Sequence, residues 1–143
     1  MSRSYPISGK TKIHVELAGG DLSVVGWDGS DLLVKGDDED VRVESTSEAV
    51  TVSCTDDLSL RVPRDAYIEF DMVSGDASIR GLAGGCELKE VSGDLSIRDV
   101  GSISIDTIHG DISLSNARGN VFIKNIHGDA SLREVDGDVT IEM

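Results

Sequence analysis

The chain has 143 residues, a normal length for one domain, and carries 27 acidic against 13 basic residues, a net charge of −14. This charge argues against nucleic acid and anionic membranes as partners, because both require a basic surface. Aromatic residues are only 3% of the sequence, so a stacking platform for bases or sugars is not indicated.

Short alternating apolar runs, separated by turn signals, fill residues 1–72 and predict strands rather than helices. The turn signals are AGGD at 18, WDGSD at 27, GDDED at 36 and TDD at 55. Pro63 should end a strand or lie at its edge, since proline cannot donate to a sheet ladder. The acidic run at 37–40 is interpreted as a solvated loop rather than a cation site. The expected strands lie around Ile13–Leu17, Leu22–Val24, Val41–Val43, Val50–Val52 and Leu58–Val62.

One short motif repeats through residues 73–143. It consists of an apolar residue, two or three turn residues and then an apolar–polar–apolar run. Its turn glycines recur every nine residues, apart from one step of eight between Gly93 and Gly101. Alternate copies are the most alike, so the full unit has about eighteen residues. Nine residues suffice for one strand and one corner, but not for a crossover helix. The clearest copies are VSGDASI from Val73, VSGDLSI from Val91, IHGDISL from Ile108 and IHGDASL from Ile126.

This spacing predicts a single-stranded parallel β-helix or β-solenoid, all-β, with two strands in each coil of about 18 residues. We expect a single domain over residues 1–143, in which residues 1–72 form irregular coils that cap the regular half-repeats of 73–143. Side chains alternate along a strand, so the three apolar positions of each phrase should point inward. Cys86 occupies such a position and is interpreted as a small buried residue. The corner glycines are expected to need a positive φ, so Gly110→Val should damage its coil.

Three stretches also carry a family resemblance: AGGDLSVVGWDGSDLLVKG, LRVPRDAYIEFDMVSGDASIRGLAGG, and the VSGDLSI and HGDISL copies. Together they resemble the bacterial and archaeal "putative adhesin" domain family of unknown function, from Ile13 to the end of the chain. The WDG, VPR and repeated GD phrases follow the order of that family. The resemblance implies a parallel β-helical fold and an association with surface or envelope-stress proteins. It supplies no catalytic residues.

Stacked coils would align the corner acids Asp76, Asp94, Asp111 and Asp129 in a ladder with a spacing of about 4.8 Å. Their repulsion can be offset if each carboxylate accepts a turn N–H, or if a cation bridges them. Calcium-binding rolls use GGxGxD, whereas this chain has one Gly–Asp per corner. The structural turn role is therefore favoured, and calcium is the alternative.

Two histidines, His109 and His127, precede the Gly–Asp step on adjacent coils and should stack. With Asp111 and Asp129 they are candidates for a weak transition-metal site, although a third good ligand is missing. A pair of exposed turn histidines is the preferred interpretation.

Two surfaces are candidates for binding. A serine ladder should form one flat face, which is interpreted either as a solvated sheet face or as a binding or self-stacking surface. At the C-terminal edge, Val139 and Ile141 belong to a last strand that we expect to have no cap. The serines of the ladder are Ser78, Ser96, Ser113 and Ser131.

No catalytic arrangement is evident, and no phosphate-binding loop precedes a helix, so we expect a non-enzymatic protein without a cofactor. The first hypothesis is a structural or interaction module that contacts a protein or self-associates through its C-terminal edge. The second is a ligand-binding module, with a divalent cation at the aspartate ladder or a carbohydrate on a face. No apolar run approaches the roughly 20 residues that span a bilayer, and the N-terminus lacks a signal peptide. We therefore expect no membrane insertion and a cytoplasmic location, or a surface location if the chain is a piece of a longer protein.

Overall fold

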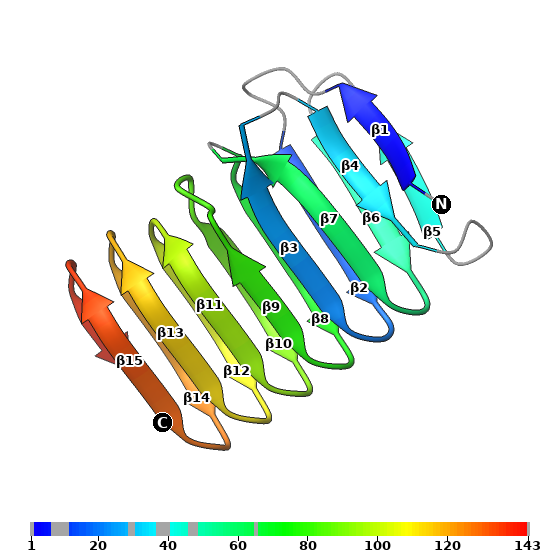
Figure 1. Cartoon of the computed structure of the whole chain (residues 1–143). Helices are drawn as coiled ribbons and strands as arrows, with labels where there is room; N and C mark the ends of the chain where they lie inside the picture. The colour runs from blue at the N-terminus through cyan, green and yellow to red at the C-terminus, as the bar shows by residue number, and fades with distance from the viewer. Residues whose placement is uncertain are drawn as a thin grey trace.

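The computed structural model describes residues 2–6, 12–28, 31–36, 41–45, 49–64 and 66–142. Within these ranges the protein is all-β, as predicted, and its strands form two eight-stranded, largely parallel sheets. Figure 1 shows the sheets face to face, with the chain passing from one to the other. The acidic run at 37–40 lies outside the described residues.

Neighbouring strands of both sheets are far apart in the sequence. Sheet A runs in the order β1 (Ser2–Pro6), β4 (Asp31–Lys35), β7 (Leu58–Pro63), β3 (Leu22–Trp27), β9 (Ala77–Arg80), β11 (Leu95–Val100), β13 (Ile112–Ala117) and β15 (Ala130–Val135). Sheet B runs in the order β16 (Val139–Ile141), β14 (Val121–Ile126), β12 (Ile103–Ile108), β10 (Cys86–Val91), β8 (Ile68–Val73), β2 (Lys12–Ala18), β6 (Ala49–Cys54) and β5 (Val41–Ser45).

From β8 onward the chain alternates regularly between the sheets. We use the word coil for one strand of sheet B and the sheet A strand that follows it, such as β10 and β11. Each strand pairs in parallel with its equivalent in the next coil, so that Ser96 lies opposite both Ser78 and Ser113. The predicted stacking of equivalent repeat positions is therefore confirmed.

The first half of the chain does not stack in chain order. Strands β2 and β3 lie directly against β8 and β9, while β6 and β7 lie on the far side of β2 and β3. Two strands that the sequence patterns did not indicate, β1 and β4, extend sheet A beyond β7, and both pair antiparallel. Pro63 is the last residue of β7, as expected. The strands of residues 2–63 thus all lie on one side of β8 and β9, and the first coil, β2 and β3, is the one next to the regular coils.

Aliphatic side chains from both halves of the chain form one buried cluster between the sheets. The inward positions predicted for the VSGDLSI copy are confirmed, because Val91, Leu95 and Ile97 are at most 1% exposed. Cys86 is also buried, and this burial raises the pKa of its thiol to about 12. The thiol is therefore protonated at neutral pH and unreactive.

The prediction of positive φ at the Gly–Asp corners is wrong. Among described glycines, only Gly81 and Gly85 have a positive φ. Gly110 is instead required by close approach, because a Cβ there would lie 2.7 Å from the carbonyl oxygen of Gly93 in the preceding coil. Left-handed residues occur at the opposite corner, at Asp99, Asn116 and Glu134. Aspartate and asparagine are among the few residue types that tolerate this conformation, which accounts for Asp99 and Asn116.

Candidate functional site

A groove of about 1040 Å³ runs across the coils along the outer side of sheet A. It is lined by serines of the sheet face and by aspartates of the adjoining corner, with Lys35 among its lining residues. The register of sheet A places one serine and one aspartate from each coil along it. The predicted members are Ser78, Ser96, Ser113, Ser131, Asp76, Asp94, Asp111 and Asp129, and the first half of the chain adds Ser23, Ser59, Asp21 and Asp57.

The aspartate ladder is a continuous hydrogen-bonded chain. In each step the Oδ1 atom of one aspartate accepts the backbone N–H of the equivalent aspartate in the next coil, so the carboxylate bridges two coils rather than closing its own turn. The predicted structural role is supported, with a different donor from the one expected. The donor and acceptor pairs are Asp21 to Asp57 at 2.8 Å, Asp76 to Asp21 at 3.0 Å, Asp94 to Asp76 at 2.9 Å, Asp111 to Asp94 at 2.9 Å and Asp129 to Asp111 at 2.7 Å.

Substituting Asp94 should separate the two effects of the ladder, since this carboxylate accepts a hydrogen bond but also repels its neighbours. Asp94→Asn retains an Oδ1 acceptor for Asp111 and removes one charge, so we expect it to stabilise the protein by about 0.5–1 kcal/mol at low salt. Asp94→Ala removes the acceptor and should cost about 1 kcal/mol relative to Asp94→Asn. Urea unfolding in low and high salt measures the stability of both variants. Equal stability of the two variants would contradict the hydrogen-bonding role.

The predicted stacking of His109 on His127 is confirmed, with ring centroids 5.0 Å apart and an angle of 13° between the planes. The Nε2 atom of His109 lies 3.0 Å from Oε1 of Glu90, a partner that the sequence did not indicate. Ring lone pairs lie in the ring planes, so stacked rings do not direct them at a common ion. Among the described residues, no group of three or more His, Cys, Asp or Glu side chains could hold a metal ion. Metal binding by these histidines stays a prediction.

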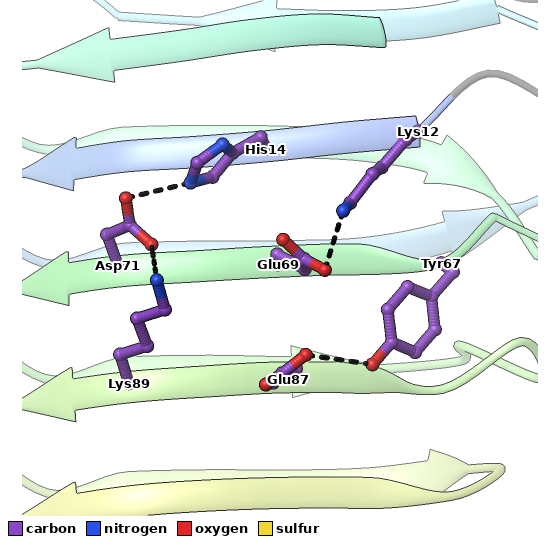
Figure 2. A network of polar contacts seen from close by, with 7 residues as sticks. All are labelled: Lys12, His14, Tyr67, Glu69, Asp71, Glu87 and Lys89. Atoms are coloured by element: carbon purple, nitrogen blue, oxygen red, sulfur yellow. Dashed lines mark hydrogen bonds and ion pairs between the residues drawn. The ribbon is translucent and has the colours of Figure 1, made fainter. Parts of the chain in front are cut away.

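A second polar cluster, on the outer face of sheet B, was not predicted (Figure 2). Asp71 lies at its centre, with Oδ2 2.8 Å from Nε2 of His14 and Oδ1 3.3 Å from Nζ of Lys89. The charged groups come from β2, β8 and β10, and β2 reaches this place only because the first coil stacks against β8. The sequence patterns do not indicate that β2 pairs with β8. Further contacts are Lys12 Nζ to Glu69 Oε1 at 2.8 Å and Tyr67 OH, as donor, to Glu87 Oε2 at 3.3 Å.

The contacts of Asp71 should make stability depend on pH. Partial burial raises the pKa of this carboxyl, but the hydrogen bonds and charges of His14 and Lys89 outweigh it and hold the pKa below its ordinary 3.8. A lowered carboxyl pKa stabilises the folded state above the unfolded value and loses that contribution as the pH falls through the folded value. We therefore expect Asp71→Asn to be less stable than wild type above about pH 4, with the difference shrinking at lower pH.

Unfolding midpoints measured from pH 7 to pH 2 check this expectation. Asp106→Asn, at an outward position of β12, is the matched control, because it removes one acidic charge from the same sheet at a residue that forms no ion pair within the described part of the chain. A difference between Asp71→Asn and wild type that stayed constant over this range would contradict the assignment.

None of the described ranges contains a helix that is long and apolar enough to span a bilayer. No protein-family model matches the chain, and no curated protein matches it.

Solved structures similar to the chain include two described as putative adhesins. One, from Bacteroides fragilis, is 14% identical with a TM-score of 0.33, and the other, from Parabacteroides merdae, is 13% identical with a TM-score of 0.30. Each comparison covers 99% of this chain and 95% of the other. At these values the similarity carries no argument about function.

Proposed function

We propose that the chain is a non-enzymatic β-solenoid module that binds another protein chain through its C-terminal coil. The observation that carries this proposal is the exposure of apolar side chains at inward positions of the last strands. Val139 is 42% exposed and Ile141 37% exposed, whereas their equivalents in the preceding coil, Val121 and Ile123, are at most 1% exposed.

The last strand of sheet A shows the same change. Leu132 of β15 is partly exposed, whereas Leu114, which lies opposite it in β13, is buried. From β8 to β13 the next coil covers these inward positions, and they are buried. An additional coil, supplied by another chain, would bury the exposed positions of the last strands at roughly 25 cal/mol for each Å² of apolar surface removed from water.

Both last strands also have a free backbone edge within the described part of the chain. Strand β15 pairs only with β13, and β16 pairs only with β14. An unpaired edge beside exposed apolar side chains is the arrangement used in binding by strand addition. Residues 130–142 carry four acids and one base, so the partner should present strands with apolar residues and positive charge.

The double variant Val139→Lys/Ile141→Lys tests this proposal, because it places charges where the partner's apolar residues would pack. The matched control, Ser131→Lys/Thr140→Lys, adds the same charge at outward positions of the same two edge strands. Proteins captured from native cells by wild type and by the control, but not by the first variant, are then purified and mixed with the chain. We expect hydrogen exchange of β15 and β16 amides to slow in the complex. A partner that still binds the first variant would contradict the proposal.

The groove along the serine and aspartate ladders supports a second candidate, a ligand-binding module for a divalent cation or a carbohydrate. One carboxylate oxygen of each ladder step accepts a hydrogen bond, which leaves the other oxygen available to a ligand. Titration calorimetry with calcium, zinc and oligosaccharides tests this candidate. Binding that is lost in Asp94→Ala would support it, and the absence of both heat and a change in Tm would exclude it.

A further inference from the structure

The outer face of sheet A carries its charges in separate rows. In each coil the ladder aspartate comes first, the ladder serine lies two residues later, and the next outward position follows after two more. The strands lie side by side in Figure 1, so equivalent positions form rows along the stack. In the order of β7, β3, β9, β11, β13 and β15, the third row holds Arg61, Val25, Arg80, Arg98, Ser115 and Arg133. We call it the arginine row.

The four arginines of this row are exposed, and none of them forms an ion pair within the described part of the chain. Arg80 and Arg98 even lie directly opposite each other, an arrangement in which like charges repel. Two exposed acids, Asp99 and Glu134, directly follow arginines of the row. Counted with them, the row has a net charge of +2, whereas the six aspartates of the ladder on the other side of the serines carry −6.

The two charged rows are far enough apart to act separately on a ligand between them. They are four residues apart along each strand, which is about 13 Å at about 3.3 Å per residue. This distance exceeds the Debye length of about 8 Å at physiological ionic strength. The serines between the rows have short side chains, and each hydroxyl can donate and accept a hydrogen bond. The groove runs along this neutral strip, so a linear ligand lying lengthwise would have a carboxylate row on one side and a guanidinium row on the other.

An extended peptide with alternating charges matches this arrangement. Side chains of an extended chain point alternately to opposite sides. If basic and acidic residues alternate, every basic side chain lies toward the aspartate ladder and every acidic side chain toward the arginine row, while the peptide backbone lies over the serine hydroxyls. A ligand of uniform charge would satisfy only one row. Among the described residues that line the groove none is aromatic, so a flat ring has no surface on which to stack.

We propose that the outer face of sheet A binds an extended segment of a partner protein in which basic and acidic residues alternate. This surface is separate from the C-terminal coil, so the inference goes beyond the proposed function and does not rest on it. Six strands at about 4.8 Å span about 24 Å from the first to the last. About eight extended residues cover this length.

Fluorescence anisotropy with labelled, end-capped octapeptides tests this inference. The probe alternates lysine and glutamate, and its matched control has four lysines followed by four glutamates, with the same composition and net charge. We expect the alternating peptide to bind at least about tenfold more tightly than the control, equivalent to about 1.4 kcal/mol, and less tightly in high salt. Peptides that alternate lysine with serine, or glutamate with serine, should also bind more weakly, because each contacts only one charged row.

Two double variants remove charge from one row each. Arg80→Gln/Arg98→Gln and Asp94→Asn/Asp111→Asn should each weaken binding of the alternating peptide about tenfold. Asparagine keeps the Oδ1 acceptors of the aspartate ladder, so the second variant retains the hydrogen bonds between coils. The matched control, Arg42→Gln/Lys124→Gln, removes two exposed positive charges from sheet B and should bind as wild type. Thermal unfolding confirms that each variant is folded before binding is measured.

Three results would overturn the inference. The first is that the alternating peptide does not bind, or binds no more tightly than its block control. The second is that the lysine–serine peptide binds equally well and Arg80→Gln/Arg98→Gln has no effect, since the face would then be a surface for cations alone. The third is self-association of the wild type, seen by sedimentation velocity and lost in both charge variants, since a second copy would then occupy the face. None of these results concerns the C-terminal coil, so the proposed function is tested separately.

Discussion

Gly110→Ala is expected to destabilise the protein by about 3 kcal/mol, the upper part of the range for overpacking in a filled interior, and Gly110→Val by more. The new Cβ would lie 2.7 Å from the carbonyl oxygen and 2.8 Å from the carbonyl carbon of Gly93. Both atoms belong to the backbone, so no side-chain rotation can relieve the overlap. The two coils would have to separate at a corner where Asp111 donates its N–H to Asp94.

Urea unfolding measures this effect, and two further variants identify its cause. Gly110→Asn should be at least as damaging as Gly110→Ala, because the limit is space; asparagine would be tolerated if the limit were a positive φ. Ser113→Ala, at an exposed position of the following strand, should change stability by no more than about 0.5 kcal/mol. An unchanged unfolding midpoint for Gly110→Ala would mean that the corners are not in close contact.

The second large effect is expected at Ile105, whose side chain is 0% exposed in β12. Ile105→Ala should cost about 2–5 kcal/mol, since it removes buried methylene groups and leaves a cavity between the sheets. Ile141 lies in the same column of stacked positions, two coils later, and is 37% exposed. Ile141→Ala should cost only about 1 kcal/mol, because fewer of its atoms leave water on folding.

Comparing the two isoleucine variants also separates stability from association. If the C-terminal coil binds a second chain, Ile141→Ala should weaken that association while having little effect on the unfolding of the dilute chain. Ile105→Ala should lower the unfolding midpoint and leave the contact surface unchanged. Equal losses of stability in the two variants would show that the last coil is covered by the protein itself, which contradicts the proposed docking surface.

Much of the regular half follows from local pattern. Leu95 and Ile97 are inward because side chains alternate along β11 and the residue between them, Ser96, is polar. The fixed spacing of the Gly–Asp phrase determines which positions stack, and it therefore predicts the ladders that include Ser96 and Asp94. These inferences need only the residues of one repeat and its period.

The reason for the corner glycine was not predictable from that pattern. A glycine in a turn has two physical explanations, a positive φ or a close neighbour, and the phrase VSGD is compatible with both. The distance from Gly110 to the Gly93 carbonyl depends on how closely two coils approach. That distance is a property of the stack, and so is the acceptance of the Asp111 N–H by Asp94.

By itself the sequence determined the all-β class, the inward and outward positions of the regular repeats and the alignment of serines, aspartates and histidines, because each depends on residues within one or two repeat periods. Only the tertiary structure decided that β2 lies between β8 and β6, which brings His14 to Asp71. It also decided that Val139 and Ile141 are left partly exposed at the end of the stack. Both depend on which strands become neighbours, and a parallel ladder joins backbone groups of almost any sequence, so local patterns cannot select the order.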